Sequence, residues 1–370
     1  MRIAQVQTPA DLKTFINLPY RFYKKDPVWI PPLRDEQNAQ FDPVRNPMLQ
    51  HCEYALFLLY DGNKAVGRIA AFIDKLAVEA WKEAVGLFGY YECPANESAA
   101  RQLLETARQW LQQHGMKYMR GPWSFVSQEW GAVVEGFKPA PVVMSPYNLP
   151  YYNEQFSAFG LEKIKDLLVY YIDARENYQI PDRIMTLTNR IADRYGVTIR
   201  TIDMDNLDHE IEVINELSNQ CLINNWGYSP VTEAEVRAMA HDLKPIIHPK
   251  AVLFAEDWLK TTIGFAIAIP DVNVLLKGLN GHMYPFGWLK LLRGIPRLNQ
   301  YRMFALGVVP EYHGKAIDSI LYRALYESCF NAELRMEINY VLEDNVLMNN
   351  AIVKLGGKPL RRYRVYQMDI

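Results

Sequence analysis

The sequence offers no segment that could cross a membrane and almost no excess of either charge. No run approaches the roughly 18 uninterrupted apolar residues that a membrane span requires. The first residues read as a strand and not as a signal peptide, because no apolar segment follows them. The formal net charge of −2 provides no basic field that would attract nucleic acid. We therefore expect a cytoplasmic protein with neither a membrane nor a nucleic acid as partner.

Cysteine and histidine are sparse as well. The four cysteines, Cys52, Cys93, Cys221 and Cys329, are scattered and form no CxxC pair, and the chain is too large for a disulfide scaffold. The seven histidines show no HxxxH or similar ligand spacing. We expect reduced thiols and no metal site.

The composition is typical of a globular protein, and the sequence contains an internal repeat. At 370 residues, 49% of them hydrophobic and 22% charged, the chain is long for one core, so two domains are expected. Segment 54–74 resembles segment 251–271, each with two apolar strand-like runs around a polar turn. Identical residues stand at one constant offset: Leu56 and Leu253, Phe57 and Phe254, Gly67 and Gly264, Ala71 and Ala268, Asp74 and Asp271.

A second match at nearly the same offset joins segments 159–173 and 355–369. Its identical pairs are Gly160 and Gly356, Val169 and Val365, Tyr170 and Tyr366, and Asp173 and Asp369. Hairpins and helix-to-strand turns can resemble one another by chance, but two matches at nearly one offset favour duplication.

Each half shows the same order of elements between these matches. A strand, a helix and a strand are expected at 85–92, 98–114 and 117–121, and again at 302–309, 315–331 and 335–341. This order predicts a right-handed parallel crossover, and the preceding hairpin makes the sheet mixed. The sequence thus predicts an α/β protein with two tandem domains, 1–176 and 177–370, the second with an insertion at 274–298.

The sharpest local signal is the segment from Leu306 to Ile317. An apolar strand ends at Pro310, a short turn with Gly314 follows, and a helix begins at once. The first amides of a helix have no partner within the helix, and its dipole adds positive charge there. The pattern therefore predicts an anion-binding turn.

These residues resemble the acyl-CoA motif of the GNAT acyltransferases, which reads L-x-V-x-P-x-Y-R-G-K-G-I-G. The matching residues are Leu306, Val308, Pro310, Tyr312, Gly314, Lys315 and Ile317. A second family motif, with a glutamate, an asparagine, a lysine and a glycine, is matched by Glu343, Asn345, Lys354 and Gly356. The resemblance covers most of the second half, and the first half mainly through the repeat. It implies two tandem GNAT-like domains.

The resemblance also implies roles for individual residues in binding acetyl-CoA or another acyl-CoA. Val308 and Val309 would face the pantetheine arm, in a gap where their strand splays from its neighbour. The phosphates would be cradled by His313, Gly314, Lys315, Ala316 and Ile317. Asn345 would lie beside the thiol-bearing end and is a candidate catalytic residue.

Four positions depart from the family pattern. The family's catalytic tyrosine is Ile352 here, its arginine or glutamine is His313, and a glycine is Ala316. Asp318, in the first helical turn, suits the helix dipole but would repel a pyrophosphate. The equivalent turn of the first half, 92–98, has no glycine and two glutamates, so we expect a helix cap by Asn96 or Ser98 there and no CoA site.

Further residues are candidates for the acceptor site and for catalysis. Trp226 and Tyr228 follow a helix that usually lines the acceptor site in this fold class, although they also suit an ordinary aromatic cap. In the first half, Glu129 in the loop 123–131 and Asn148 and Tyr152 in a later loop are candidates for contact with substrate. Glu337 is a candidate general base, with an outward-facing strand carboxylate as the alternative.

The leading hypothesis is an N-acyltransferase that uses acyl-CoA to acylate a small-molecule or peptide amine. Two alternatives remain open. One is an aminoacyl-tRNA-dependent transferase, as in peptidoglycan-building relatives of this fold. The other is a non-catalytic module whose tandem fold binds a ligand or a partner protein.

Overall fold

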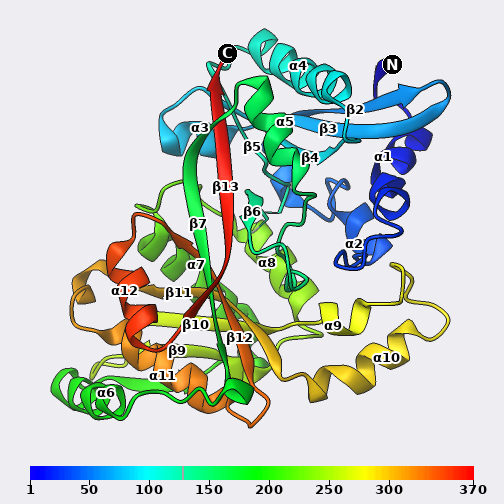
Figure 1. Ribbon diagram of the computed structural model, residues 1–370. Coiled ribbons are helices and arrows are strands. Elements are labelled where there is room, and N and C mark those ends of the chain that lie inside the picture. Colours follow the sequence, from blue (N-terminus) through cyan, green and yellow to red (C-terminus); the bar gives the residue numbers. More distant parts are fainter. Residues whose placement is uncertain (127–128) are drawn as a thin grey trace. The chain divides into compact units, whose positions relative to one another are not determined.

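The computed structural model describes residues 1–126 and 129–370, which form two compact units (Figure 1). Unit 1 comprises Met1–Leu167, Leu276–Trp288 and Arg361–Ile370, and unit 2 comprises Leu168–Leu275 and Leu289–Leu360. Neither unit is continuous in sequence. The predicted division near residue 176 stays a prediction about the repeat, whereas the mixed α/β fold class is confirmed.

Unit 1 is built on a mixed sheet in which β4 and β5 are parallel. Its strand order is β1-β2-β3-β4-β5-β13, and β6 also pairs with β13. The strands are β1 (Arg2–Gln5), β2 (Cys52–Asp61), β3 (Lys64–Asp74), β4 (Val85–Glu92), β5 (Tyr118–Gly121), β6 (Ala132–Glu135) and β13 (Lys358–Asp369). The helices are α1 (Pro9–Phe22), α2 (Arg34–Ala39), η1 (Pro47–Gln50), α3 (Lys75–Trp81), α4 (Glu97–Gln113) and α5 (Tyr151–Phe159).

Unit 2 repeats the plan with the strand order β12-β11-β10-β9-β8, in which β11 and β12 are parallel. The strands are β8 (Thr198–Thr201), β9 (Val252–Glu256), β10 (Thr262–Pro270), β11 (Gln300–Val308) and β12 (Arg335–Leu342). The second half of β7 (Glu162–Asp173) also belongs to this unit. The helices are η2 (Ala174–Glu176), α6 (Asp182–Tyr195), η3 (Met204–Asn206), α7 (Leu207–Leu222), α8 (Glu233–Leu243), η4 (Pro249–Ala251), η5 (Ile295–Arg297), η6 (Pro310–Tyr312), α11 (Ile317–Cys329) and α12 (Val346–Lys354). The insertion contains α9 (Asn273–Leu276) and α10 (Gly287–Gly294), at which the chain passes between the two units.

The local sequence explains the elements that matter most for the site. In unit 1, Gly62 has a φ of +56° in the turn between β2 and β3, as a tight hairpin requires. Helix α4 buries Leu103, Leu104, Ala107 and Leu111, three and four residues apart, against the sheet. In unit 2, α11 buries an equivalent stripe that includes Ile317, Leu321 and Leu325. Helices thus follow the central strands β4 and β11 in the order that the repeat predicted.

No helix in the described part of the chain has both the length and the apolar character that crossing a bilayer requires.

Candidate functional site

In unit 2, the central strand β11 loses its parallel neighbour halfway along. Gln300–Met303 pair with Arg335–Ile338 of β12, and among the described residues the register between the two strands ends there. On its other edge β11 stays paired with β10 as far as Val308. The edge that faced β12 is therefore left without a strand partner from Phe304 onward. Backbone groups on such an edge can bond an extended ligand.

A β-bulge marks the same point on β11. Met303 pairs with Ala268 and Ala305 pairs with Ile267, so Phe304 is the extra residue. Bulges bend a strand and often stand beside functional sites. Phe304, Ala305 and Leu306 are each partly exposed, although they lie on a central strand of the sheet. The bulge and the ended pairing together give the splay that the GNAT resemblance implied.

The turn that follows β11 presents unpaired backbone amides at the start of α11. Gly314 has a φ of +74° and Ala316, the residue before α11, a φ of +57°. Within the described part of the chain, no side chain caps the helix. Among the described residues, the backbone N–H groups of Gly314, Ala316, Ile317 and Asp318 have no hydrogen-bond partner. Free amides in this arrangement, with the positive end of the helix dipole, favour an anion such as a phosphate.

Side chains hold this turn in place. His313 Nε2 lies 2.8 Å from the carbonyl oxygen of Val308 and donates to it, so Nε2 carries the proton. The Tyr312 hydroxyl donates to Asp257 Oδ2 at 3.0 Å. Lys315 Nζ lies 4.1 Å above the ring of Tyr312, which keeps a cation at the turn. Val309 is buried and its amide bonds to the carbonyl of Ile263.

The two predicted catalytic residues have different surroundings. Glu337 is fully buried on β12, in register with Arg302 of β11, and its Oε1 lies 3.4 Å from Arg335 Nη2. Asn345 is exposed, and its side-chain oxygen accepts from the amide of Met348 at 3.1 Å as the cap of α12. Ile352, at the family's tyrosine position, is buried in the unit 2 core.

The predicted acceptor residues fall into two groups. Trp226 and Tyr228 follow α7 in unit 2, where the Tyr228 hydroxyl donates to Asn219 Oδ1 at 2.8 Å. Helix α7 packs closely on β11, since a Cβ added at Gly307 would lie 2.8 Å from the Cβ of Cys221. The loop 313–317, Glu337, Asn345, Trp226 and Tyr228 therefore all belong to unit 2.

The other three acceptor candidates belong to unit 1. Asn148 is buried, and its side chain bonds to both backbone groups of Val133, so it ties a loop to β6. Glu129 is partly buried, and its amide bonds to the carbonyl of Val126. Ser127 and Gln128 of the same loop lie outside the described residues.

Tyr152, the last of these candidates, belongs to a buried polar cluster in unit 1 that the sequence did not indicate. Its hydroxyl donates to Glu92 Oε2 at 2.9 Å, and the hydroxyl of Tyr23 donates to the same oxygen. Arg68 Nη2 lies 3.4 Å from the other oxygen of Glu92. Burial raises the pKa of Glu92 above its ordinary value despite these partners. A glutamate that ends an otherwise apolar central strand was the available signal.

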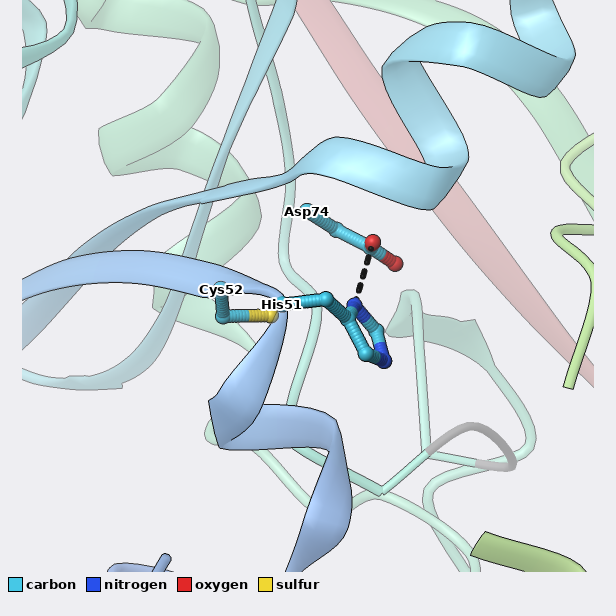
Figure 2. Close-up of side chains that lie close together, drawn as sticks. All are labelled: His51, Cys52 and Asp74. Carbon is cyan, nitrogen blue, oxygen red and sulfur yellow. Dashed lines mark hydrogen bonds and ion pairs between the residues drawn. The ribbon is translucent and has the colours of Figure 1, made fainter. Parts of the chain in front are cut away.

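His51, Cys52 and Asp74 form a second cluster in unit 1, shown in Figure 2. One potential ligand atom from each lies within 4.8 Å of the others, a set of types that suits a transition metal. However, Asp74 Oδ1 already accepts from His51 Nδ1 at 2.9 Å and from the amides of Leu76 and Ala77. Asp74 thus acts as the cap of α3, and the absence of a metal site stays a prediction.

Comparisons with known proteins cover the whole chain. No family model matches. Two curated proteins are similar along almost their entire lengths: the "Bacterial ceramide synthase" of Caulobacter vibrioides, 32% identical over 99% of this chain and 97% of its own, and "Protein YghO" of Escherichia coli, 31% identical over 97% of this chain and 93% of its own.

Solved structures share the fold at low sequence identity. A tandem GNAT protein from the clavulanic acid biosynthesis pathway covers 100% of this chain and 98% of its own, with a TM-score of 0.57 and 13% identity. A GCN5-related N-acetyltransferase from Sphaerobacter thermophilus covers 99% of this chain and 95% of its own, with a TM-score of 0.54 and 12% identity. The tandem GNAT fold that the motifs implied is confirmed.

Proposed function

Because this chain belongs to the family that includes the bacterial ceramide synthase of Caulobacter vibrioides and protein YghO of Escherichia coli, we propose that it is an N-acyltransferase for a long-chain amine. A ceramide is the amide of a fatty acid and a long-chain amino alcohol. The proposed reaction moves an acyl group from coenzyme A to the amino group of such an alcohol. The observation that carries the proposal is 32% identity over 99% of this chain and 97% of that relative.

The residues at the start of α11 fit the donor of this reaction. Four free amides, at Gly314, Ala316, Ile317 and Asp318, offer the hydrogen bonds that a pyrophosphate needs, and Lys315 adds a cation. Space around Gly314 is open, since a Cβ added there would meet nothing within 4 Å. The carboxylate of Asp318 opposes an anion and weakens the site. We assign the phosphates to this turn and the pantetheine arm to the unpaired edge of β11.

The chemistry needs few further groups. The free amine attacks the thioester carbonyl carbon, the new C–N bond forms as the C–S bond breaks, and the amine proton leaves while the thiolate takes one up. Binding both reactants side by side supplies most of the acceleration that this step requires. We assign Trp226 and Tyr228, which follow the helix α7 that packs on β11, to the acceptor side, and Asn345 to the thiol end.

The role of Glu337 follows from its surroundings. A base must reach the amine proton, but Glu337 is fully buried and faces Arg335. We therefore propose that Glu337 positions β12 beside β11 rather than accepting the proton directly.

The test is amide formation by the purified full chain. Palmitoyl-CoA and sphinganine form one substrate pair, and acetyl-CoA with a short, water-soluble amino alcohol forms the other. Thiol release reports turnover, and mass spectrometry identifies the amide. We expect product from the long-chain pair, and product from the short pair alone would refute the long-chain acceptor. No amide and no rise in melting temperature with millimolar CoA would favour the non-catalytic alternative.

A matched pair of variants tests the turn itself. Gly314 and Gly115 have φ values of +74° and +79°, and a Cβ would meet nothing within 4 Å at either. Replacing either glycine by valine should therefore lower the free energy of unfolding by a similar amount, about 1–2 kcal/mol. Only Gly314→Val should also lower the rate of acyl transfer, by about tenfold or more, because this substitution displaces the amides that hold the phosphates. Equal activity in the two variants would remove the turn from the proposal.

A further inference from the structure

The insertion at 274–298, of which Leu276–Trp288 belong to unit 1 and the rest to unit 2, contains basic residues and no acidic residue. Between Asp271 and Glu311 the sequence contains no acidic residue. The cations in the insertion are Lys277, Lys290, Arg293 and Arg297, all with exposed side chains. The whole chain has a formal charge of −2, so the residues outside the insertion carry a net negative charge. The insertion thus has a one-sided positive charge within a chain that is acidic overall.

The same insertion exposes large apolar side chains. Tyr284 is 80% exposed, Phe286 76% and Leu292 64%, and Trp288 is also exposed. In α10, Trp288 and Leu292 are four residues apart and lie on one side of the helix, with Arg293 next to Leu292 around the axis. The exposed side of this short helix is therefore apolar and aromatic with a cationic border. We call Tyr284–Arg293 the aromatic segment (Figure 1).

The aromatic segment is held by its own hydrogen bonds and close packing. Trp288 Nε1 donates to the carbonyl of Pro285 at 2.9 Å, and the Trp288 amide donates to the carbonyl of Met283 at 3.0 Å. After the helix, Gly294 lies close to Leu275, since a Cβ added there would be 2.6 Å from a Leu275 methyl carbon. The apolar side chains are thus displayed by an ordered turn and helix. Such a surface favours an apolar partner.

We propose that the aromatic segment docks the protein onto the surface of an anionic lipid bilayer. Exposed tryptophan, tyrosine and phenylalanine suit the boundary between headgroups and acyl chains, and neighbouring lysine and arginine are attracted to anionic lipid. The segment would lie on the bilayer surface without spanning it, so it needs neither the length nor the continuous apolar character of a membrane span. This differs from our expectation of no membrane partner, which considered only spans and net charge.

A second exposed apolar pair shows why charge decides between surfaces. Trp258 and Leu259, in the turn between β9 and β10, are 73% and 62% exposed. Glu256 and Asp257 precede them directly, and Arg200 and Lys260 pair with Glu256, so this turn lacks the unopposed positive charge that would attract an anionic bilayer. Exposure alone therefore does not make the assignment, and this pair provides a matched control.

The inference rests on the proposed function in one respect. A long-chain amine is dissolved in the membrane, so the enzyme must reach the membrane surface to bind it. The test uses the full chain and flotation with phosphatidylcholine vesicles, with or without phosphatidylglycerol. We expect binding to the anionic vesicles and its loss at high salt. Phe286→Ser with Trp288→Ser, and separately Arg293→Glu with Arg297→Glu, should each weaken binding about tenfold or more. Trp258→Ser with Leu259→Ser should bind as the wild type does.

Two further measurements separate docking from catalysis. With substrates dispersed in detergent, all variants should turn over at the wild-type rate. With the amine in vesicles, the variants at Phe286 and Trp288 and at Arg293 and Arg297 should acylate it more slowly, whereas the variant at Trp258 and Leu259 should not. The proposal is overturned if those variants float as well as the wild type, or if the protein ignores vesicles and binds an acidic acyl carrier protein through this segment instead. Absence of amide in every format, with vesicle binding intact, would refute the proposed function and leave the docking surface standing.

Discussion

Both units place a helix after a strand that pairs in parallel with its neighbour for only a few residues. In unit 1, β4 pairs with β5 from Val85 to Leu87 and then continues to Glu92. In unit 2, β11 pairs with β12 from Gln300 to Met303 and then continues to Val308. The two units thus share the splay, and they differ in what lies beside the strand beyond it.

Unit 1 fills the space beside its splayed strand with its own chain. The amide of Trp123 bonds to the carbonyl of Phe88, and Tyr23, Tyr152 and Arg68 surround Glu92. In unit 2, Phe304, Ala305 and Leu306 stay partly exposed, and no strand partner succeeds β12 among the described residues. The same backbone plan can thus serve as a buried core or as a ligand edge, depending on the side chains after the strand.

The first turns of α4 and α11 also differ in whether a side chain already bonds their backbone amides. The Asn96 side chain caps α4 by accepting from the Ala99 amide at 2.8 Å. Helix α11 has no side-chain cap, and Ala316 before it adopts a left-handed conformation. A cap satisfies amides that an anion would otherwise bond. We propose on this basis that unit 1 lacks a CoA site.

Removing the buried acid of unit 1 should have the largest effect on stability. Glu92→Ala removes the carboxylate that the Arg68 side chain, 5% exposed, and two tyrosine hydroxyls contact. Loss of one member of a buried ion pair costs about 3–5 kcal/mol. Urea denaturation should show this loss, with Glu92→Gln less affected because it keeps shape and an acceptor. Unchanged stability of Glu92→Ala would mean that this cluster does not close the strand end of unit 1.

Two aspartates on β7, one in each unit, should differ in how pH controls stability. Burial opposes ionisation of Asp166, yet bonds to Arg364 and Lys163 outweigh it and hold its pKa below the ordinary value. In the unfolded chain the pKa returns to about 3.8, so the stabilisation is present above that pH and is lost as pH falls through the folded-state pKa. We expect Asp166→Asn to cost about 2 kcal/mol at pH 7 and nothing in strong acid.

Asp173 provides the weaker counterpart in unit 2. Its bonds to Arg175 lower its pKa too, but the Arg175 side chain is half exposed. Asp173→Asn should cost less than about 1 kcal/mol at pH 7. Denaturant unfolding of both variants between pH 3 and 7 checks the pair. A penalty for Asp166→Asn that does not change with pH would contradict the electrostatic explanation.

The helix starts should respond to substitution with opposite signs. Asn96→Ala removes the cap of α4 and should cost about 1 kcal/mol. Ala316→Gly relieves a side chain at a φ of +57° and should gain about 0.5–1 kcal/mol. Differential scanning calorimetry of the two single variants measures both shifts in melting temperature. Destabilisation by Ala316→Gly would show that the left-handed conformation at this position is not strained.

The smallest expected effect concerns charge in the first helical turn. Asp318→Asn removes a carboxylate from the α11 turn and should tighten CoA binding about threefold, or about 0.7 kcal/mol. Glu97→Gln makes the same change at the start of α4 and should leave CoA affinity unchanged. Isothermal titration of both variants tests this contrast. Equal gains in affinity would place the anion elsewhere on the chain.

Several features of the fold were available from local sequence patterns. The repeat located the hairpins, and two aspartates that it pairs bond to the backbone two residues on: Asp74, the cap of α3, accepts from Leu76, and Asp271 accepts from Asn273. The spacing of Leu103, Ala107 and Leu111 correctly predicted the buried face of α4. The α11 helix begins later than its predicted start at 315, because residues 313–316 form the turn that exposes the amides.

The sequence by itself determined the duplicated α/β plan, the strand–turn–helix order after β11 and the one-sided charge of the insertion, because these depend on periodicity, turn residues and composition along the chain. Only the tertiary structure decided that Glu92 is enclosed by Tyr23, Tyr152 and Arg68, that Glu337 is fully buried, and that β11 loses its neighbour at Phe304. These outcomes depend on contacts between residues far apart in sequence. At such contacts, burial sets the free-energy cost of a charged group, and strand pairing decides whether a backbone amide is free to bond a ligand.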